Sequence, residues 1–236
     1  MKLTYLYHSG FVVEGANCTI IIDFYKDSDD KYLENSLATF KGKLYVCASH
    51  WHPDHFNKDI LQWKNVRSDT QYIFSDDVRQ KKRISLREVF FLNKGDVFKD
   101  DIICITAFGS TDVGISFLIE TEGKKIFHAG DLNNWHWDEE STPEEIQEAE
   151  QNFLNELQTL ATETNHLDLA MFPVDSRLGQ NYQHGAEQFV DAIQTDLFAP
   201  MHFGSKYRQA NAFQSYAENA GCKFAAWTKT GESLLF

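Results

Sequence analysis

A short segment that combines three histidines with an aspartate limits what this chain can fold into. Residues 49–55 read Ser-His-Trp-His-Pro-Asp-His, which places three imidazoles and a carboxylate within six residues. The segment follows the apolar run 44–48, whose β-branched and aromatic residues predict a buried strand that ends where the polar residues begin. Imidazole and carboxylate groups bind zinc, iron or manganese in proteins, and polar groups without partners at the end of a buried strand would be costly. The segment therefore predicts a divalent metal site at a strand end.

Other apolar runs of the chain also end in polar residues that could bind a metal. The runs 102–107, 125–129 and 197–201 are followed by Ser110 and Thr111, by Asp131, and by His202. Strand ends that meet at one edge of a β core can hold such side chains rigidly around an ion. We therefore predict that Asp131 and His202 join the histidine-rich segment at one metal site.

The spacing of the histidine-rich segment is also recognisable. The pattern His-x-His-x-Asp-His resembles the signature of the metallo-β-lactamase superfamily, and here it consists of His50, His52, Asp54 and His55. Residues 127–131 resemble the superfamily segment that carries an aspartate bridging two metals, and residues 200–202 resemble the one that carries the last histidine ligand. The resemblance covers most of the chain and implies an α/β (α+β) fold, namely a four-layer αββα sandwich with a metal groove along one edge between two sheets.

The N-terminus extends this resemblance. Residues 8–10 read His-Ser-Gly and resemble the N-terminal segment of the lactonase-like branch of the superfamily, typified by ascorbate-6-phosphate lactonase, in which a histidine lies near the active site. The resemblance makes His8 a candidate pocket residue, although a single histidine beside a glycine turn can also be purely structural.

The resemblance implies six metal ligands shared between two ions. One ion would bind Asp54, His55, Asp131 and His202, and the other would bind His50, His52 and Asp131. The superfamily usually has a further histidine ahead of the bridging aspartate, but residues 107–111 read Ala-Phe-Gly-Ser-Thr. Ser110 or Thr111 could supply a weak oxygen ligand, His136 or His184 could swing in, or the position could stay open to water or substrate, as in catalytic sites. We therefore expect either two positions of unequal affinity, with the ion on Asp54, His55 and His202 held more firmly, or a single ion. Zinc is the first choice, with manganese or iron as alternatives.

Residues near the predicted metals could bind a substrate. Residues 133–137 read Asn-Asn-Trp-His-Trp, and two indoles that flank an imidazole next to a metal are typical of a pocket wall. We therefore assign Trp135 and His136 to substrate binding. Arg177 and Lys206 follow two of the predicted strand ends and could fix an anionic group of the substrate.

Composition favours a cytoplasmic protein that acts on a small molecule. No stretch approaches the ~20 continuous apolar residues of a membrane span. The four cysteines are scattered, without a Cys-x-x-Cys pair, and indicate reduced thiols in a cytoplasmic protein. The formal charge of −13 weighs against nucleic acid as a partner, although the basic residues Arg79, Lys81, Lys82, Arg83 and Arg87 could form a local patch. Because no linker or low-complexity segment interrupts it, we predict a single domain over residues 1–236.

The clearest helix signal begins at Thr142. Thr142 and Glu145 have the spacing of a capping box, and Pro143 suits the first helical position. Apolar residues then recur at three- and four-residue steps as far as Leu160, which predicts a helix packed on the core. The tail predicts a further helix over 211–219 and a short final strand over 224–227.

These features together predict a metal-dependent hydrolase. A bound dication supplies hydroxide at neutral pH, and the chain has no Gly-x-Ser-x-Gly motif or cysteine placed as a nucleophile. The expected substrate is a small-molecule ester, lactone or amide, and Asp54 would orient the metal-bound hydroxide and shuttle protons. A phosphodiesterase acting on a small phosphorylated substrate is the alternative. A non-catalytic metal-binding or sensor protein is a third possibility, because one expected histidine ligand is missing.

Overall fold

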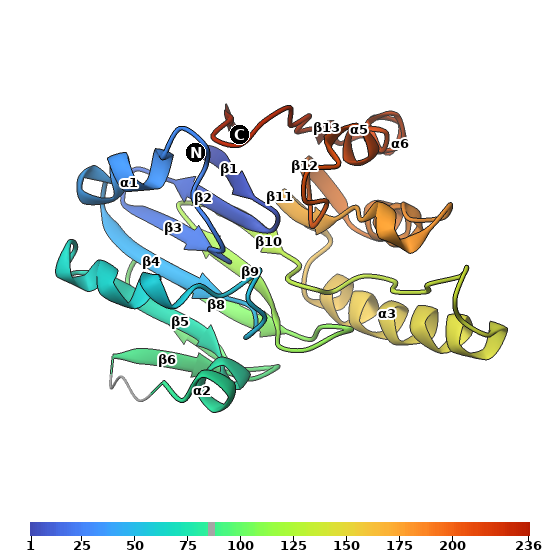
Figure 1. Ribbon diagram of the computed structural model, residues 1–236, viewed down its shortest axis with the longest axis horizontal. Helices are drawn as coiled ribbons and strands as arrows, with labels where there is room; N and C mark the ends of the chain where they lie inside the picture. Colours follow the sequence, from blue (N-terminus) through green and yellow to red (C-terminus); the bar gives the residue numbers. More distant parts are fainter. Residues whose placement is uncertain (85–87) are drawn as a thin grey trace.

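The protein folds into two β-sheets that stack face to face, with helices on both outer sides (Figure 1). The structure is a computed structural model, and it describes residues 1–84 and 88–236. Within these ranges each sheet has seven strands, in the orders β14-β1-β2-β3-β4-β5-β6 and β13-β12-β11-β10-β9-β8-β7. The first sheet consists of β1 (Lys2–Tyr7), β2 (Gly10–Glu14), β3 (Cys18–Ile22), β4 (Lys43–Ala48), β5 (Gln71–Ser75), β6 (Val89–Leu92) and β14 (Ser233–Leu235). The second consists of β7 (Val97–Lys99), β8 (Ile103–Phe108), β9 (Ser116–Thr121), β10 (Lys124–His128), β11 (His166–Pro173), β12 (Gln194–Met201) and β13 (Lys223–Phe224).

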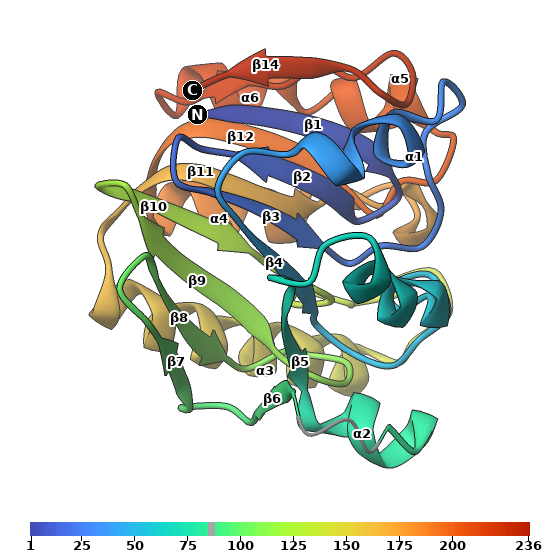
Figure 2. The same cartoon turned by 90° about the vertical axis from the view of Figure 1, so that its left-hand side faces the viewer.

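The helices form the two outer layers, which confirms the predicted αββα sandwich (Figures 1 and 2). The first sheet is covered by α1 (Tyr32–Ser36), η1 (Leu37–Thr39), η2 (Lys58–Asn65) and α2 (Asp76–Lys82). The second sheet is covered by α3 (Pro143–Glu163), α4 (His184–Ala192), α5 (Tyr207–Asn211) and α6 (Gln214–Asn219).

The alternation of side chains along the strands explains why both faces of each sheet are buried. In β4, Tyr45 and Cys47 belong to the core between the two sheets, whereas Leu44 and Val46 belong to the cluster under the helices of the first sheet. Tyr45 packs edge-on against Phe98 of the second sheet, with the ring centroids 6.3 Å apart. The inner core therefore contains side chains from both sheets.

The direction of the strands brings distant segments to one edge of the sandwich. Strands β3 to β6 pair in parallel, and so do strands β10 to β13. Strand β8 is antiparallel to β9, which is antiparallel to β10, so β8 and β10 run the same way. Because the carboxyl ends of strands that run together lie at the same edge, the loops after these strands can meet there.

Helix α3 begins at the predicted capping box. The Thr142 hydroxyl accepts a hydrogen bond from the Glu145 amide at 3.3 Å, and the Glu145 carboxylate accepts one from the Thr142 amide at 2.8 Å. The helix then buries its apolar stripe, with Phe153, Leu157 and Leu160 inside the core.

We expect Thr142→Ala to lower the free energy of unfolding by about 1 kcal/mol, because it leaves amides of the first turn of α3 without an acceptor. Thr159→Ala changes an exposed threonine in the interior of the same helix and serves as the control, with an expected change of about 0.5 kcal/mol or less. Urea denaturation of the two variants measures the difference. Equal stability of the two would contradict the capping role of Thr142.

The C-terminal region differs from its prediction. The helix expected over 211–219 is divided into α5 and α6, and the expected final strand is limited to β13. The sequence also gave no indication of β14, which pairs with β1 through Leu234 and Leu3. A strand of three residues has too little pattern of its own to be recognised, since its position depends on long-range pairing.

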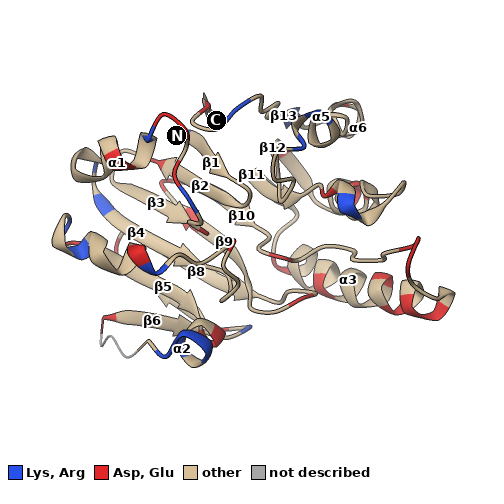
Figure 3. Cartoon of the chain, viewed as in Figure 1, with Lys and Arg blue, Asp and Glu red and all other residues tan. Residues whose placement is uncertain are grey.

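Acidic and basic residues are concentrated on different helices. Acidic residues lie along α3 and basic residues on α2 (Figure 3). Lys81 and Lys82 stack over the ring of Trp51, and Arg87, which the sequence groups with them, lies outside the described residues.

Among the residues that the structure describes, no helix has the length and apolar character needed to cross a membrane. All four cysteines are free thiols, and a cytoplasmic location stays a prediction.

Candidate metal centre

The carboxylate of Asp131 lies at the centre of a buried cluster of histidines. Asp131 follows β10, and its Oδ1 lies 3.1 Å from His55 Nε2 and 3.3 Å from His202 Nε2. Its Oδ2 lies 3.3 Å from His50 Nε2. The histidine-rich segment after β4, Asp131 and the residue after β12 therefore meet at one edge of the sandwich, although they are far apart in the sequence.

One group of possible ligands lies beside the N-terminal strands. It contains His8, Asp54, His55 and His202, each with a ligand atom within 4.8 Å of the others. His8 comes from the turn between β1 and β2, and its Nε2 lies 3.3 Å from Asp54 Oδ2. The His8 carbonyl accepts a hydrogen bond from the His202 amide at 3.1 Å, which ties the two turns together. Both histidines have a left-handed backbone, with φ of 58° and 64°, a strain that often accompanies function.

A second group lies on the other side of Asp131. It contains His52, Asp112 and Asp131, again within 4.8 Å of one another, and His50 borders it. Asp112 belongs to the loop between β8 and β9, in the region where the sequence left a ligand missing. The Thr111 hydroxyl bonds with the backbone of Asn133, because it donates to the carbonyl at 2.6 Å and accepts from the amide at 2.9 Å.

The inward-facing atoms of this cluster have no other partners. His8 Nε2, His50 Nε2, His55 Nε2 and Asp131 Oδ1 are buried and form no hydrogen bond with any described residue. Buried polar atoms rarely remain unpaired, because leaving them so is costly. Ligand atoms around one ion lie about 3–3.5 Å apart, since metal–ligand bonds measure about 2.0–2.2 Å. The observed separations of 3.1–3.3 Å fit that spacing, so these residues suit one or two divalent cations.

The outer nitrogens of the histidines are held by a second set of acceptors. His55 Nδ1 donates to Asp23 Oδ2 at 2.7 Å, and His202 Nδ1 donates to Asp175 Oδ2 at 2.9 Å. His50 Nδ1 donates to the Ser49 hydroxyl at 2.9 Å, which in turn donates to Asp23. These bonds keep a proton on each Nδ1, so that each Nε2 would be the metal-binding atom once it has lost its own proton. The sequence did not identify Asp23 and Asp175, although each comes directly after an apolar strand.

Asp175→Asn tests this arrangement. We expect zinc to bind about 10–100-fold more weakly, because an amide no longer fixes the tautomer of His202 with a carboxylate. Asp196→Asn is the matched control, since Asp196 accepts from His166 at 2.9 Å on the exposed surface, away from the cluster. Competition with a chromophoric chelator measures both affinities. Equal zinc affinity of the wild type and Asp175→Asn would contradict the role of Asp175.

The burial of the histidines also predicts a pH dependence. Burial lowers the pKa of His8 to about 4 and that of His50 to about 3, from an ordinary value of 6.5. As the pH falls below 6.5, the unfolded chain takes up protons on these residues before the folded protein does, so the free energy of unfolding decreases. Burial also opposes the charged form of His55, but the Asp131 and Asp23 carboxylates outweigh it and raise the pKa of His55 to about 10. Below pH 6.5, His55 is therefore protonated in both the folded and the unfolded state. It does not contribute to the pH dependence of the free energy of unfolding in that range.

We therefore expect the metal-free protein to lose stability steadily between pH 6.5 and pH 4.5, as measured by its urea midpoint. The His8→Ala variant should show a smaller loss over the same range, since it removes one of the buried histidines whose pKa is lowered. A midpoint that does not change with pH in this window would contradict the expected proton uptake.

A cavity of about 430 Å³ opens over the second group of ligands. Its walls include Trp135, Trp137 and Arg177. The two indole rings stack with centroids 6.2 Å apart, and Trp135 Nε1 donates to the Asp131 carbonyl at 2.7 Å. The guanidinium of Arg177 is held by two hydrogen bonds from Nε and Nη2 to Asp175 Oδ2, at 2.8 and 2.5 Å. Trp135 and Arg177, both predicted from the sequence, thus lie in the wall of this cavity.

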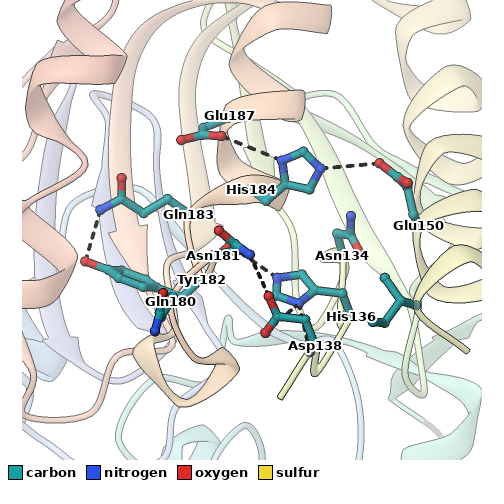
Figure 4. A pocket seen from close by; sticks show the side chains of 11 residues that line it. Asn134, His136, Asp138, Glu150, Gln180, Asn181, Tyr182, Gln183, His184 and Glu187 are labelled. Carbon is teal, nitrogen blue, oxygen red and sulfur yellow. Dashed lines mark hydrogen bonds and ion pairs between the residues drawn. The ribbon is translucent and has the colours of Figure 1, made fainter. Parts of the chain in front are cut away.

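The structure does not bring His136 and Lys206 to this cavity. His136 lines a separate cavity of about 540 Å³, where its Nε2 donates to the Asn181 carbonyl at 3.2 Å (Figure 4). The segment after Asp131 is an irregular loop, in which Asn134, His136 and Asp138 line one cavity while Trp135 and Trp137 line the other. Lys206 is exposed at the start of α5 and does not line the metal cavity.

His184, considered as a substitute ligand, also belongs to the separate cavity. Its imidazole lies near Glu150 and Glu187, at 3.3 and 3.7 Å (Figure 4). Neither His184 nor His136 therefore fills the position left by the missing histidine.

Comparison with known families shows which family has this fold and this histidine-rich segment. The family model described as "Beta-lactamase superfamily domain" matches residues 2–148, which include the histidine-rich segment and Asp131. The protein belongs to the metallo-β-lactamase superfamily. The predicted membership is thereby confirmed.

Relatives within the metallo-β-lactamase superfamily are distant in sequence. A protein of Alkaliphilus metalliredigens named "UPF0173 metal-dependent hydrolase" is 24% identical over 219 residues, which cover 87% of this chain and 86% of the relative. A protein of the same name from Korarchaeum cryptofilum is 25% identical over 139 residues, 56% of this chain, and the match spans only 60% of that relative. The solved structure of Igni18, a metallo hydrolase from Ignicoccus hospitalis, has a TM-score of 0.70 at 22% identity and covers 99% of this chain and 97% of its own. These three names do not support the lactonase-like branch in particular.

Proposed function

We propose that the protein is a metal-dependent hydrolase that cleaves an ester, lactone or amide bond in a small molecule. The observation that carries this proposal is a set of buried Nε2 and carboxylate atoms without partners, gathered around Asp131, which lines an open cavity of about 430 Å³. Cavities of that size suit small organic ligands. The names of the two curated relatives support the same class of reaction.

A bound divalent cation would acidify a water molecule and polarise the carbonyl oxygen of the substrate. Asp54 is the residue best suited to move protons in this reaction, because it belongs to the first ligand group and also lines the cavity. The His8 imidazole, whose Nε2 lies 3.3 Å from Asp54 Oδ2, and the charge of His55 hold the pKa of Asp54 well below its usual range, against the effect of burial. Asp54 is therefore an ionised acceptor at the boundary between the cluster and the cavity.

The cavity walls suggest how a substrate is held. Trp135 and Trp137 offer a flat apolar surface, which favours a planar or aliphatic group. Arg177 presents a guanidinium whose orientation is fixed by Asp175, and such a fork suits a carboxylate or phosphate. The best substrate should therefore combine an apolar group with an anionic one.

Zinc is the ion that we propose for the position beside His8, His55 and His202. Imidazole nitrogen suits zinc, and this group has three imidazoles and a single carboxylate, apart from Asp131. Two ions are our preferred stoichiometry, because the second group lies on the opposite side of Asp131.

Hydrolysis of a phosphodiester is the second candidate function, and Arg177 is the observation that favours it. A guanidinium binds the oxygens of a phosphate group as readily as it binds those of a carboxylate. A non-catalytic role is less favoured, since Asp112 supplies a carboxylate where the sequence alone left a ligand missing.

The two reactions can be separated with a panel of chromogenic substrates. Zinc-loaded protein is assayed on p-nitrophenyl esters, lactones and anilides, and on bis(p-nitrophenyl) phosphate. Faster turnover of the carbonyl compounds would support the proposal, and faster turnover of the phosphodiester would favour the alternative. Absence of turnover on the whole panel with two ions bound would count against both.

The same panel tests the cavity wall. Arg177→Ala should raise KM for substrates with a carboxylate by about tenfold and leave neutral substrates nearly unchanged, since a lost charge-assisted hydrogen bond costs about 1.4 kcal/mol. Arg208→Ala, on the exposed side of α5, is the control. Equal effects on charged and neutral substrates would contradict the role of Arg177.

A further inference from the structure

The two groups of possible ligands around Asp131 differ in their donor atoms. Apart from Asp131 itself, the first group offers the three imidazoles of His8, His55 and His202 and one carboxylate. The second group offers His52, with His50 beside it, and the carboxylate of Asp112. With Asp131 included, the second position therefore has two nitrogen and two oxygen donors.

Asp112 is held in place from both sides of its loop. On one side, Thr111 donates to the Asn133 carbonyl at 2.6 Å and accepts from the Asn133 amide at 2.9 Å. On the other side, the Ile115 amide donates to the Ser49 carbonyl at 3.0 Å, directly before the histidine-rich segment. The loop between β8 and β9 is thereby tied both to the segment after Asp131 and to the end of β4.

The backbone at Gly114 allows this close approach. Gly114 has φ of +79°, and a Cβ there would come within 2.2 Å of the Ser49 carbonyl and 2.4 Å of His50 Cβ. Only glycine fits at that distance, and its presence lets the loop pack directly against His50. As a result Asp112 Oδ2 lies 3.7 Å from His52 Nδ1.

The negative charges of Asp112 and its neighbour Asp131 also favour a bound cation. A carboxylate oxygen of Asp112 lies within 4.8 Å of a carboxylate oxygen of Asp131. Two neighbouring carboxylates, of which Asp131 is buried and Asp112 is exposed, repel unless a positive charge lies between them. A divalent ion shared by His52, Asp112 and Asp131 would remove this repulsion.

We propose that Asp112 is a protein ligand of the second ion, and that its carboxylate makes this position favour manganese(II) or iron(II), relative to zinc, more than the histidine-rich position does. Carboxylate oxygen suits manganese, and two histidines with a carboxylate form a typical iron(II) set, whereas imidazole alone suits zinc. The inference rests on the proposed metal-dependent function, because it names the ion that the same centre takes. It does not depend on which bond the enzyme cleaves.

Metal competition tests this inference without any substrate. The metal-free full-length protein is incubated with equal concentrations of manganese and zinc, and the amount of each metal per chain is measured by mass spectrometry. The electron paramagnetic resonance signal of bound manganese gives an independent reading. We expect the wild type to retain both metals and Asp112→His to lower the ratio of manganese to zinc by about tenfold or more, since changes even outside the ligands cost about 10–100-fold in metal affinity.

Two further variants keep the test decisive. Asp101→His makes the same substitution at an exposed position away from the cluster, and it should retain the wild-type ratio. Asp112→Asn preserves the size of the side chain and should weaken manganese binding by at least about tenfold, even if Asp112→His fails to fold. An unchanged ratio in Asp112→His, or unchanged manganese affinity in Asp112→Asn, would overturn the proposal. Because metals are counted and no turnover is measured, failure of the proposed hydrolysis would leave this result intact.

Discussion

Asp131→Ala is expected to lose both ions and to reduce kcat/KM by at least about a thousandfold, because a metal supplies several kcal/mol of transition-state stabilisation. Asp131 is the only described side chain whose carboxylate lies within 3.3 Å of His50, His55 and His202 together. Asp131 belongs to the second group and lies within 3.3 Å of two histidines of the first, so its removal should weaken both positions at once. Metal content by mass spectrometry and turnover of the best panel substrate provide the two measurements.

The matched control for Asp131→Ala is Asp138→Ala. Asp138 lies seven residues further along the same segment, but it lines the separate cavity. This variant should keep the wild-type metal content and kcat/KM within a factor of about three, as a substitution outside the centre. An Asp131→Ala protein that still binds two ions, or that loses less than tenfold in activity, would contradict the bridging position of Asp131.

Metal removal should have the largest effect on stability. The folded protein brings together ligands that are far apart in the unfolded chain, so an ion that binds only the folded state stabilises it by mass action. At a free zinc concentration of about 1,000 times Kd, the free energy of unfolding should rise by about 4 kcal/mol. Thermal unfolding of chelated and zinc-loaded protein measures the change as a shift in Tm.

The Asp131→Ala variant is again informative in this experiment, because its Tm should respond little to zinc. If the chelated and zinc-loaded wild-type proteins unfold at the same temperature, the cluster does not bind the ion in the folded state. That result would contradict the metal centre itself.

The part of the centre that could be predicted from the sequence is the part with a compact pattern. The histidine-rich segment lies within six residues, and Asp131 and His202 each follow an apolar run, so their convergence followed from parallel strand ends. Helix α3 was equally predictable, because its capping box and apolar stripe are local.

The residues that could not be predicted depend on long-range geometry. Asp112 has no local sequence pattern that marks it as a ligand. Its position depends on the hydrogen bond between Ile115 and Ser49, which holds its loop against the end of β4. Asp23 and Asp175 become partners of His55 and His202 only when the strand ends meet. His8 was a candidate from resemblance, and its place beside Asp54 depends on the turn between β1 and β2 folding onto the end of β12.

His136 illustrates the opposite case, in which the sequence named a residue that the structure directs elsewhere. The two neighbouring tryptophans do line the metal cavity, but His136 lines the separate cavity on the other side of the same loop. The sequence predicts a loop there, as the structure shows, but a loop has no repeating pattern from which the direction of each side chain could be predicted.

The most direct test of the central claim is a crystal structure with anomalous scattering measured at the zinc and manganese absorption edges, from protein supplied with both metals. We predict one ion between Asp131, His55 and His202, and a second between Asp131, His52 and Asp112. Ions bound only to other side chains, or no anomalous peak in contact with Asp131, would contradict this account.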